Sequence, residues 1–260
     1  MFALLAILDA LGCLTLGLAL YFGFGNSDGV HWHLMRCVGG QFMTAAFMFF
    51  SFRKSNLETL SAYYLLRILV CHLFPFISEY YVRSNRYPFT RERFLKYWWF
   101  IWLVISITQQ IRVNWVVGHT TNVLTDLENV LYQLDSITSI SIGAAWLAFP
   151  KWLLNRQVNV ILDESHEFCA RIMGAYFLTS HIISTRALNF KKDTDRVVAI
   201  DCRTILCITV LIAQIWSQYA YTDDWSGGHW VGISLFSTWT IISSLYRIHV
   251  MLQNRKAKCD

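Results

Sequence analysis

The chain has 260 residues, of which 55% are hydrophobic and only 15% charged, and its mean hydropathy is +0.39. Soluble domains usually carry about 25% charged residues, so this composition argues against a soluble globular protein and predicts an all-α integral membrane protein. The net charge of +5 does not indicate a nucleic-acid partner, because Lys and Arg cluster in particular loops, as membrane topology demands.

Eight apolar segments predict transmembrane helices, because a bilayer core about 30 Å thick needs about 20 apolar residues per span. In chain order they are Phe2–Phe24, His33–Phe52, Leu57–Tyr80, Tyr97–Val117, Val130–Phe149, Phe168–Leu188, Val197–Tyr219 and His229–Met251. The first segment could instead be a secretory signal peptide, but it lacks a basic n-region and Asp9 interrupts its apolar run.

Two stretches of the chain match without a gap, one starting at Asp28 and the other at Asp163. Six of their seventeen positions are identical, where background usage predicts about one or two. These identities are Asp28/Asp163, His31/His166, Arg36/Arg171, Gly39/Gly174, Phe42/Phe177 and Thr44/Thr179. A chance match between apolar segments is the alternative, but the matched residues are mostly polar or glycine.

Upstream of these stretches, Asp9 and Gly17 match Asp135 and Gly143 at equal spacing. The sequence therefore predicts two tandem four-helix repeats, and an even number of spans in each repeat makes the two parallel, related by an axis along the membrane normal. The predicted divisions are repeat 1–117, linker 118–129, repeat 130–251 and tail 252–260.

Four-helix units whose second helix opens with Arg-x-x-Gly (Arg36 to Gly39, and Arg171 to Gly174) resemble DoxX-type small membrane proteins. This motif is too short to transfer the role of any residue.

The distribution of Lys and Arg predicts that both termini are cytosolic. With eight spans, the side that holds the termini has eleven of these residues in its loops and helix ends, and the opposite side has seven. The tail carries Lys256 and Lys258, which resemble a dilysine endoplasmic-reticulum retrieval signal read by cytosolic coat machinery. We therefore expect a location in the endoplasmic reticulum, with a chance basic tail as the alternative.

Charged residues inside apolar segments indicate buried ion pairs, because an unpaired charge in the bilayer costs several kcal/mol. Asp9 and Arg67 lie at depths that differ by only about 5 Å at 1.5 Å per residue, and the same holds for Asp135 and Arg203. We expect one Asp–Arg pair per repeat, joining the first helix of the repeat to the third. The pairs could fix helix register or line a ligand or ion pathway.

A second candidate site lies at the opposite ends of the second and sixth helices. His31 and Arg36, with His166 and Arg171 in the other repeat, could bind an anionic headgroup or carboxylate. Alternatively, the preceding aspartates cap the helices while His and Arg extend to the membrane interface. Four glycines predict close helix packing; they are Gly17, Gly39, Gly143 and Gly174.

The expected function is non-enzymatic: binding of a lipid, a small anionic ligand or a membrane-protein client between the repeats. One alternative is a secondary transporter that uses the Asp–Arg pairs. Another is a lipid-modifying enzyme with His31 or His166 as general base. Motifs for a catalytic serine, a zinc protease or a phosphate-binding loop are absent from the sequence, and we expect no metal and no cofactor.

Overall fold

The protein is described here by a computed structural model, which covers residues 2–23, 28–83, 92–119 and 126–256. These residues form helices and loops with one isolated β-bridge, so the predicted all-α class is confirmed. The eight long helices among them are α1 (Phe2–Phe22), α2 (Gly29–Phe52), α3 (Leu57–Arg83), α4 (Glu92–Arg112), α5 (Asp126–Ala148), α7 (Glu164–Ala187), α8 (Asp193–Ala220) and α9 (His229–Lys256).

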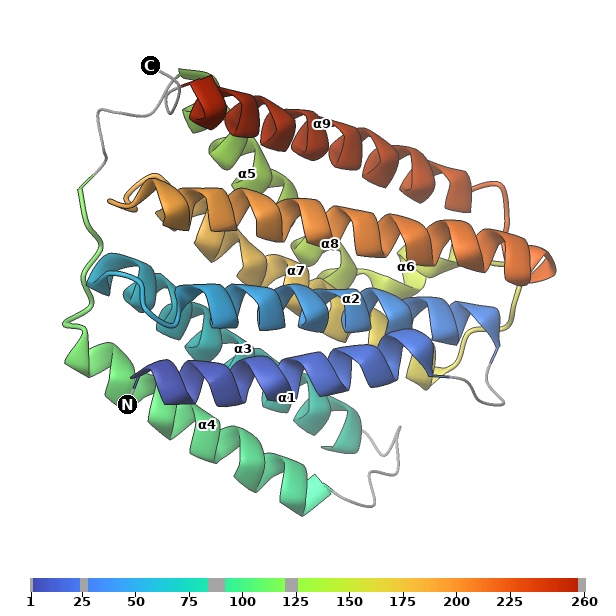
Figure 1. Ribbon diagram of the computed structural model, residues 1–260. Helices are drawn as coiled ribbons and strands as arrows, with labels where there is room; N and C mark the ends of the chain where they lie inside the picture. The colour runs from blue at the N-terminus through green and yellow to red at the C-terminus, as the bar shows by residue number, and fades with distance from the viewer. Residues whose placement is uncertain (1, 24–27, 84–91, 120–125, 257–260) are drawn as a thin grey trace.

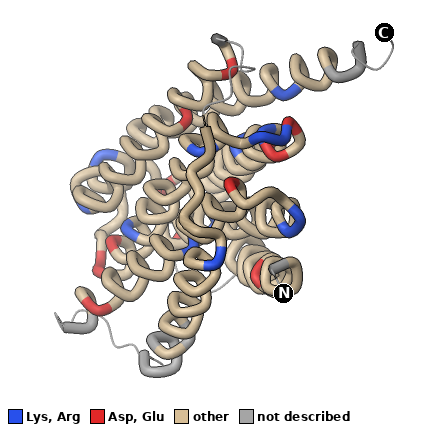
Figure 2. The backbone as a smooth tube through the Cα atoms, turned by 90° about the vertical axis from the view of Figure 1, so that its left-hand side faces the viewer, with Lys and Arg blue, Asp and Glu red and all other residues tan. Residues whose placement is uncertain are grey.

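Successive long helices run in alternating directions through one bundle (Figure 1). As a result, the start of α1 and the end of α9 lie at the same end of the bundle. Figure 2 views this end, where Lys and Arg residues lie around the helix ends and connecting loops.

Within the described part of the chain, three helical segments are long and apolar enough to cross a membrane, which supports a membrane protein. They are Ala3–Phe22, Leu57–Tyr81 and Asp193–Ala220.

Local polar chemistry explains where helix boundaries differ from the predicted segments. α2 and α7 begin at Gly29 and Glu164, four residues before their apolar runs, because Asp28 and Asp163 cap them. A cap side chain accepts hydrogen bonds from backbone N–H groups that otherwise lack partners. α4 ends at Arg112 rather than at the predicted Val117, because Asn114 and Trp115 adopt positive φ values of 54° and 53°.

The apolar-segment analysis missed one short helix, α6 (Pro150–Asn155), which starts at a proline. Beyond it, the chain pairs with the loop before α9, through a β-bridge between Val158 and Trp225 and a hydrogen bond from Ser226 N to Gln157 O of 2.8 Å. These contacts close the end of the bundle opposite the termini.

The helices pack in matching pairs. α1 packs on α2 as α5 packs on α7, and α3 packs on α4 as α8 packs on α9. The central pairings cross between the two halves of the chain: α2 lies against α8, α7 lies against α3, and α2 and α7 contact each other.

The four predicted packing glycines lie at two close helix crossings. A Cβ on Gly39 would lie 2.8 Å from Gly17 O, and a Cβ on Gly143 would lie 2.8 Å from Gly174 O. Because real Cβ atoms essentially never come closer than 3.0 Å, both crossings require a residue without a side chain.

We expect Gly143→Ala to destabilise the protein by about 1–3 kcal/mol, the usual cost of overpacking. Its Cβ would lie 2.3 Å from Leu178 N, so the α5–α7 backbones would have to separate. Gly12→Ala is the control, because a Cβ there meets nothing within 4 Å. Unfolding of both variants in detergent tests this, and equal midpoints would contradict it.

Candidate functional site

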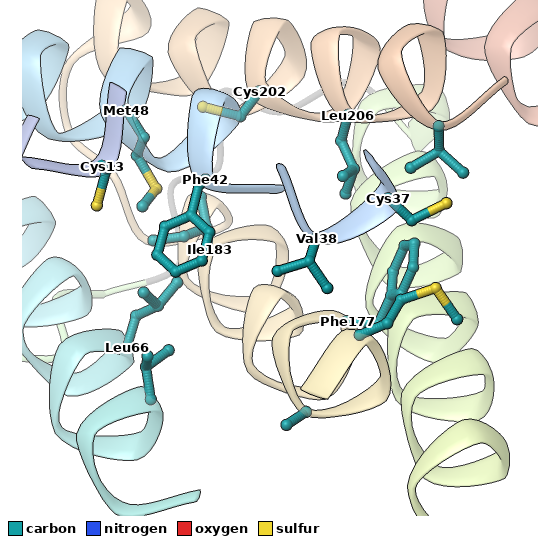
Figure 3. Close-up of a cluster of buried hydrophobic side chains, with 14 of the residues drawn as sticks. Cys13, Cys37, Val38, Phe42, Met48, Leu66, Phe177, Ile183, Cys202 and Leu206 are labelled. Carbon is teal, nitrogen blue, oxygen red and sulfur yellow. The ribbon is translucent and has the colours of Figure 1, made fainter. Parts of the chain in front are cut away.

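A cavity lies between the two halves of the chain, where α2, α3, α7 and α8 meet. Its volume is about 80 Å³, which is room for several water molecules at about 10–15 Å³ each. Most of the lining is apolar, and Figure 3 shows part of it, with Phe42 of α2, Leu66 of α3 and Ile183 of α7 directed toward one another. Arg67 and Arg203 also line the cavity.

The lining residues correspond between the halves at the spacing of the sequence repeat. Arg67 corresponds to Arg203 and Thr44 to Thr179, and both members of each pair contact the cavity. Further corresponding pairs in the lining are Gln41/Tyr176, Phe49/Ser184, Leu66/Cys202 and Val70/Leu206. Equivalent surfaces therefore face each other across this space.

The structure contains the predicted ion pair between Asp9 of α1 and Arg67 of α3. Arg67 Nη2 donates to Asp9 Oδ1 at 2.9 Å, and both side chains are buried. Tyr63 OH donates to the other carboxylate oxygen. The guanidinium also lies near the rings of Phe49 and Trp102, 5.4 Å and 4.9 Å from their centroids. A carboxylate and aromatic rings therefore surround this arginine.

The second predicted pair, between Asp135 of α5 and Arg203 of α8, is also present. Arg203 Nε lies 3.2 Å from Asp135 Oδ2. Arg203 Nη2 donates to Ser139 Oγ at 2.6 Å and to Ser184 Oγ at 3.3 Å. Hydroxyl groups therefore take the place that aromatic and sulfur-containing side chains occupy around Arg67.

Two uncharged polar atoms in the cavity wall have no hydrogen-bond partner among the described residues. Gln41 Oε1 is one of them, although Gln41 Nε2 donates to Met173 O at 3.3 Å and the residue is only 7% exposed. Tyr176 OH, at the corresponding position of α7, is the other. An unpartnered buried polar atom costs about 1–3 kcal/mol, so these atoms favour a polar occupant of the cavity.

The second candidate site lies where α2 and α7 begin, at the end of the bundle away from the termini. His166 Nε2 lies 2.9 Å from Asp28 Oδ2, and His166 Nδ1 lies 2.7 Å from Asp163 Oδ1. The rings of His31 and His166 are 6.0 Å apart. Histidine and aspartate from both halves therefore form one cluster, which we call the cap cluster: Asp28, His31, Asp163 and His166.

Hydrogen bonding sets the pKa values of the two capping aspartates. Partial burial opposes ionisation of Asp28, but hydrogen bonds from the His31 backbone and the His166 side chain outweigh it and lower its pKa. Asp163 is also partly desolvated. Bonds from Ser165 and His166 nevertheless lower its pKa to about 2.

The hydrogen bonds of Arg36 and Arg171 lead away from the cap cluster, to the preceding helices. Arg36 Nε donates to Tyr21 O at 3.3 Å, and Arg171 Nη1 donates to Leu147 O. Both carbonyls lie at the ends of the preceding helices, α1 and α5. Since each helix end leaves carbonyls without intrahelical donors, these arginines satisfy the backbone. Arg36 is 4% exposed, so it does not extend to an interface.

Sequence reasoning missed the polar neighbours of the ion pairs. Tyr63 lies four residues before Arg67 on α3, and Ser139 lies four residues after Asp135 on α5, so helical spacing could have indicated these two. Ser184 lies on α7, which carries neither member of the ion pair, so no spacing could have indicated it. It also left Asp201 without a partner, whereas Arg247 of α9 pairs with it.

Among the described residues, no group of three or more His, Cys, Asp or Glu could hold a metal ion. Lys256 ends α9, and Lys258 lies outside the described residues. The retrieval signal therefore stays a prediction.

We expect Asp9→Asn to destabilise the protein by about 3–5 kcal/mol, because it leaves the buried Arg67 charge without a carboxylate. Unfolding in detergent measures this loss. Asp201→Asn is the control and should cost less, since the side chains of Asp201 and Arg247 are 23% and 26% exposed. A double variant, Asp9→Asn with Arg67→Gln, should recover part of the loss, and simple additivity would contradict a coupled pair.

We expect Asp163→Ala to cost about 0.5–2 kcal/mol near neutral pH, since it removes the cap of α7. The folded pKa of about 2 lies below the unfolded value of 3.8. The ionised carboxylate therefore stabilises the fold above about pH 5, and this contribution disappears as the pH falls toward 2. Unfolding of the wild type and Asp163→Ala from pH 7 to pH 3 tests this. Asp163→Asn keeps a cap that does not titrate, and a loss for Asp163→Ala that is constant with pH would contradict the assignment.

No curated protein and no solved structure matches the chain. One family model, described as "Domain of unknown function (DUF8292)", matches residues 6–248. That range includes both ion pairs, the cavity lining and the cap cluster. The chain therefore belongs to the DUF8292 family.

Proposed function

We propose that this protein crosses the membrane eight times as two parallel four-helix repeats and binds a small anionic ligand or lipid headgroup in the cavity between them. The observation that carries this proposal is the pair of buried arginines in the cavity wall.

Helix length and surface support eight spans. At 1.5 Å per residue, the 24 residues of α2 extend about 36 Å, which exceeds a hydrocarbon core of about 30 Å. The outermost helices expose large apolar side chains even though they are not among the three most apolar spans. Examples are Phe100, Ile101 and Val104 on α4 and Leu235, Ile241 and Leu245 on α9. Lipid tails would cover such surfaces.

Corresponding interactions support a repeat. Each half has a glycine crossing, a buried Asp–Arg pair and an arginine that donates to the carbonyl at the end of the preceding helix. Every one of these pairs follows the spacing read from the sequence. The helix pairings match in the same way, which favours a two-fold axis through the cavity.

The electrostatics of the cavity favour an anion. Arg67 and Arg203 are the charged residues of its lining, whereas Asp9 and Asp135 lie outside the lining. In a low-dielectric surrounding, a guanidinium attracts an anion strongly and offers several donors. The small volume of the cavity favours a small ion or a headgroup over a whole lipid.

The location and orientation are part of the same proposal. The shared end of α1 and α9 carries most of the loop Lys and Arg, which supports cytosolic termini. An endoplasmic-reticulum location depends on Lys256 and Lys258. Replacement of both lysines by serine, followed by imaging of the tagged protein in cells, would test it.

We expect small anions or anionic lipids to stabilise the detergent-purified protein, by about 2.7 kcal/mol at 100 times Kd. Ala45→Leu adds bulk to the cavity wall and should weaken this effect at least tenfold in ligand concentration. Ala144→Leu is the matched control, because Ala144 is exposed on α5. The measurement is a thermal shift across phosphate, sulfate, acetate and anionic lipids.

Absence of stabilisation by any of these anions would contradict the proposal. In that case, a role in the maturation of a membrane-protein client would gain support. Loss of that client in cells without this protein would test this role.

A secondary transporter is the second candidate, favoured by a cavity between the two halves whose wall holds one ion-paired arginine from each half. Flux of the bound anion into proteoliposomes, lost in Asp135→Asn, would support it. The geometry gives less support to an enzyme, because carboxylates contact both ring nitrogens of His166, which leaves neither open to act as a general base.

A further inference from the structure

The two ion pairs occupy corresponding positions but have different surroundings, and this difference carries a further inference. Around Arg67 lie Cys13 and Phe49, and the positions that correspond to them around Arg203 are Ser139 and Ser184. The charged residues are therefore the same in both halves, whereas the residues next to the arginines differ.

Arg67 has the properties of a structural residue. Its Nη2 donates directly to the Asp9 carboxylate, which Tyr63 also holds. Phe49 and Trp102 lie near its guanidinium. A ligand anion would have to compete with a charged partner in a largely aromatic surrounding.

Arg203 is better placed to accept a ligand. Its Nε pairs with Asp135, as Arg67 pairs with Asp9, but its Nη2 donates to two neutral serine hydroxyls, whereas Nη2 of Arg67 donates to the carboxylate. Hydroxyl groups rotate and can donate as well as accept, so Ser184, which lines the cavity, can turn to donate to an anion that contacts Arg203. Two further hydroxyl groups of α7, those of Thr179 and Ser180, line the cavity together with Ser184. In the first half, the position that corresponds to Ser180 is Ala45, which has no hydroxyl.

Gln41 adds a second requirement. Its Nε2 is engaged by Met173 O, so the unpartnered Oε1 needs a hydrogen-bond donor. A simple carboxylate or sulfate has acceptor oxygens only, and would leave this atom unsatisfied. A monoprotonated phosphate group has acceptor oxygens for Arg203 and the serines, and an O–H for Gln41.

We infer that Arg203 binds the ligand while Arg67 only holds α1 to α3, and that the ligand is a phosphate group, either free or as the headgroup of a phosphate monoester lipid. This inference rests on the proposed function, since it assigns the chemistry of the same cavity.

The first test compares ligands on the wild-type protein in detergent. Inorganic phosphate and dispersed phosphatidic acid supply the same group from two sources, and sulfate supplies a similar shape without the O–H. We expect at least tenfold tighter binding of phosphate or phosphatidic acid than of sulfate, by calorimetry or thermal shift. The preferred source is the one that binds at the lower concentration.

The second test compares the two arginines. Arg203→Lys keeps the charge but loses the planar set of donors, and should weaken phosphate binding at least tenfold. Arg67→Lys should lower the unfolding midpoint without ligand and change phosphate affinity less than threefold. The reverse pattern, or an equal loss of affinity in both variants, would overturn the assignment.

The third test fills the cavity with a bulky side chain next to Arg203. Ser184→Phe introduces the residue found at the corresponding position 49, and should abolish phosphate binding. Ser141→Phe is the matched control on the exposed face of α5. If Ser184→Phe fails to fold, Ser139→Ala with Ser184→Ala removes the same donors with less bulk and should still weaken binding at least tenfold. Unchanged affinity in the folded variant overturns the inference.

The outcomes separate the two proposals. Binding of acetate or sulfate as tight as that of phosphate leaves the anion-binding cavity standing and overturns the phosphate assignment. Stabilisation by none of the anions overturns both.

Discussion

The buried arginines impose the main constraint on this structure. A guanidinium in an apolar bundle must have a partner, since an unpaired charge there costs several kcal/mol. Asp9 and Asp135 meet this need from the first helix of each half, so α1 has to stay beside α3 and α5 beside α8. The glycine crossings bring the outer helices close enough for these bonds. The cavity lies on the inner side of the same arginines.

The sequence was informative wherever burial or charge leaves a pattern. Apolar runs indicated all eight long helices, and depth along the helices predicted the partner of Arg67. Contacts between helices of the two halves could not be predicted, because hydropathy does not specify which helix packs against which. The direction of Arg36 was missed for a related reason: its partner is the carbonyl of Tyr21, and any residue would supply such an acceptor.

The two halves share their packing glycines and ion pairs, but the residues around the ion pairs differ. Corresponding positions of the two halves carry the same glycines and the same charged residues, because few other residues allow close backbone contact or neutralise a buried charge. The neighbours are less constrained: a ring at Phe49 and a hydroxyl at Ser184 both fit beside an arginine, one by stacking and the other by hydrogen bonding. Corresponding positions of the two halves thus surround one arginine with aromatic rings and the other with hydroxyl groups.

The crossed packing of α2 on α8 and of α7 on α3 has a consequence for biosynthesis. During translation the first four helices are made before α7 and α8 exist, so the inner faces of α2 and α3 lack the partners that the second half supplies. Nascent chains that stop in the linker would therefore present these faces to lipid, insertion factors and quality-control proteases.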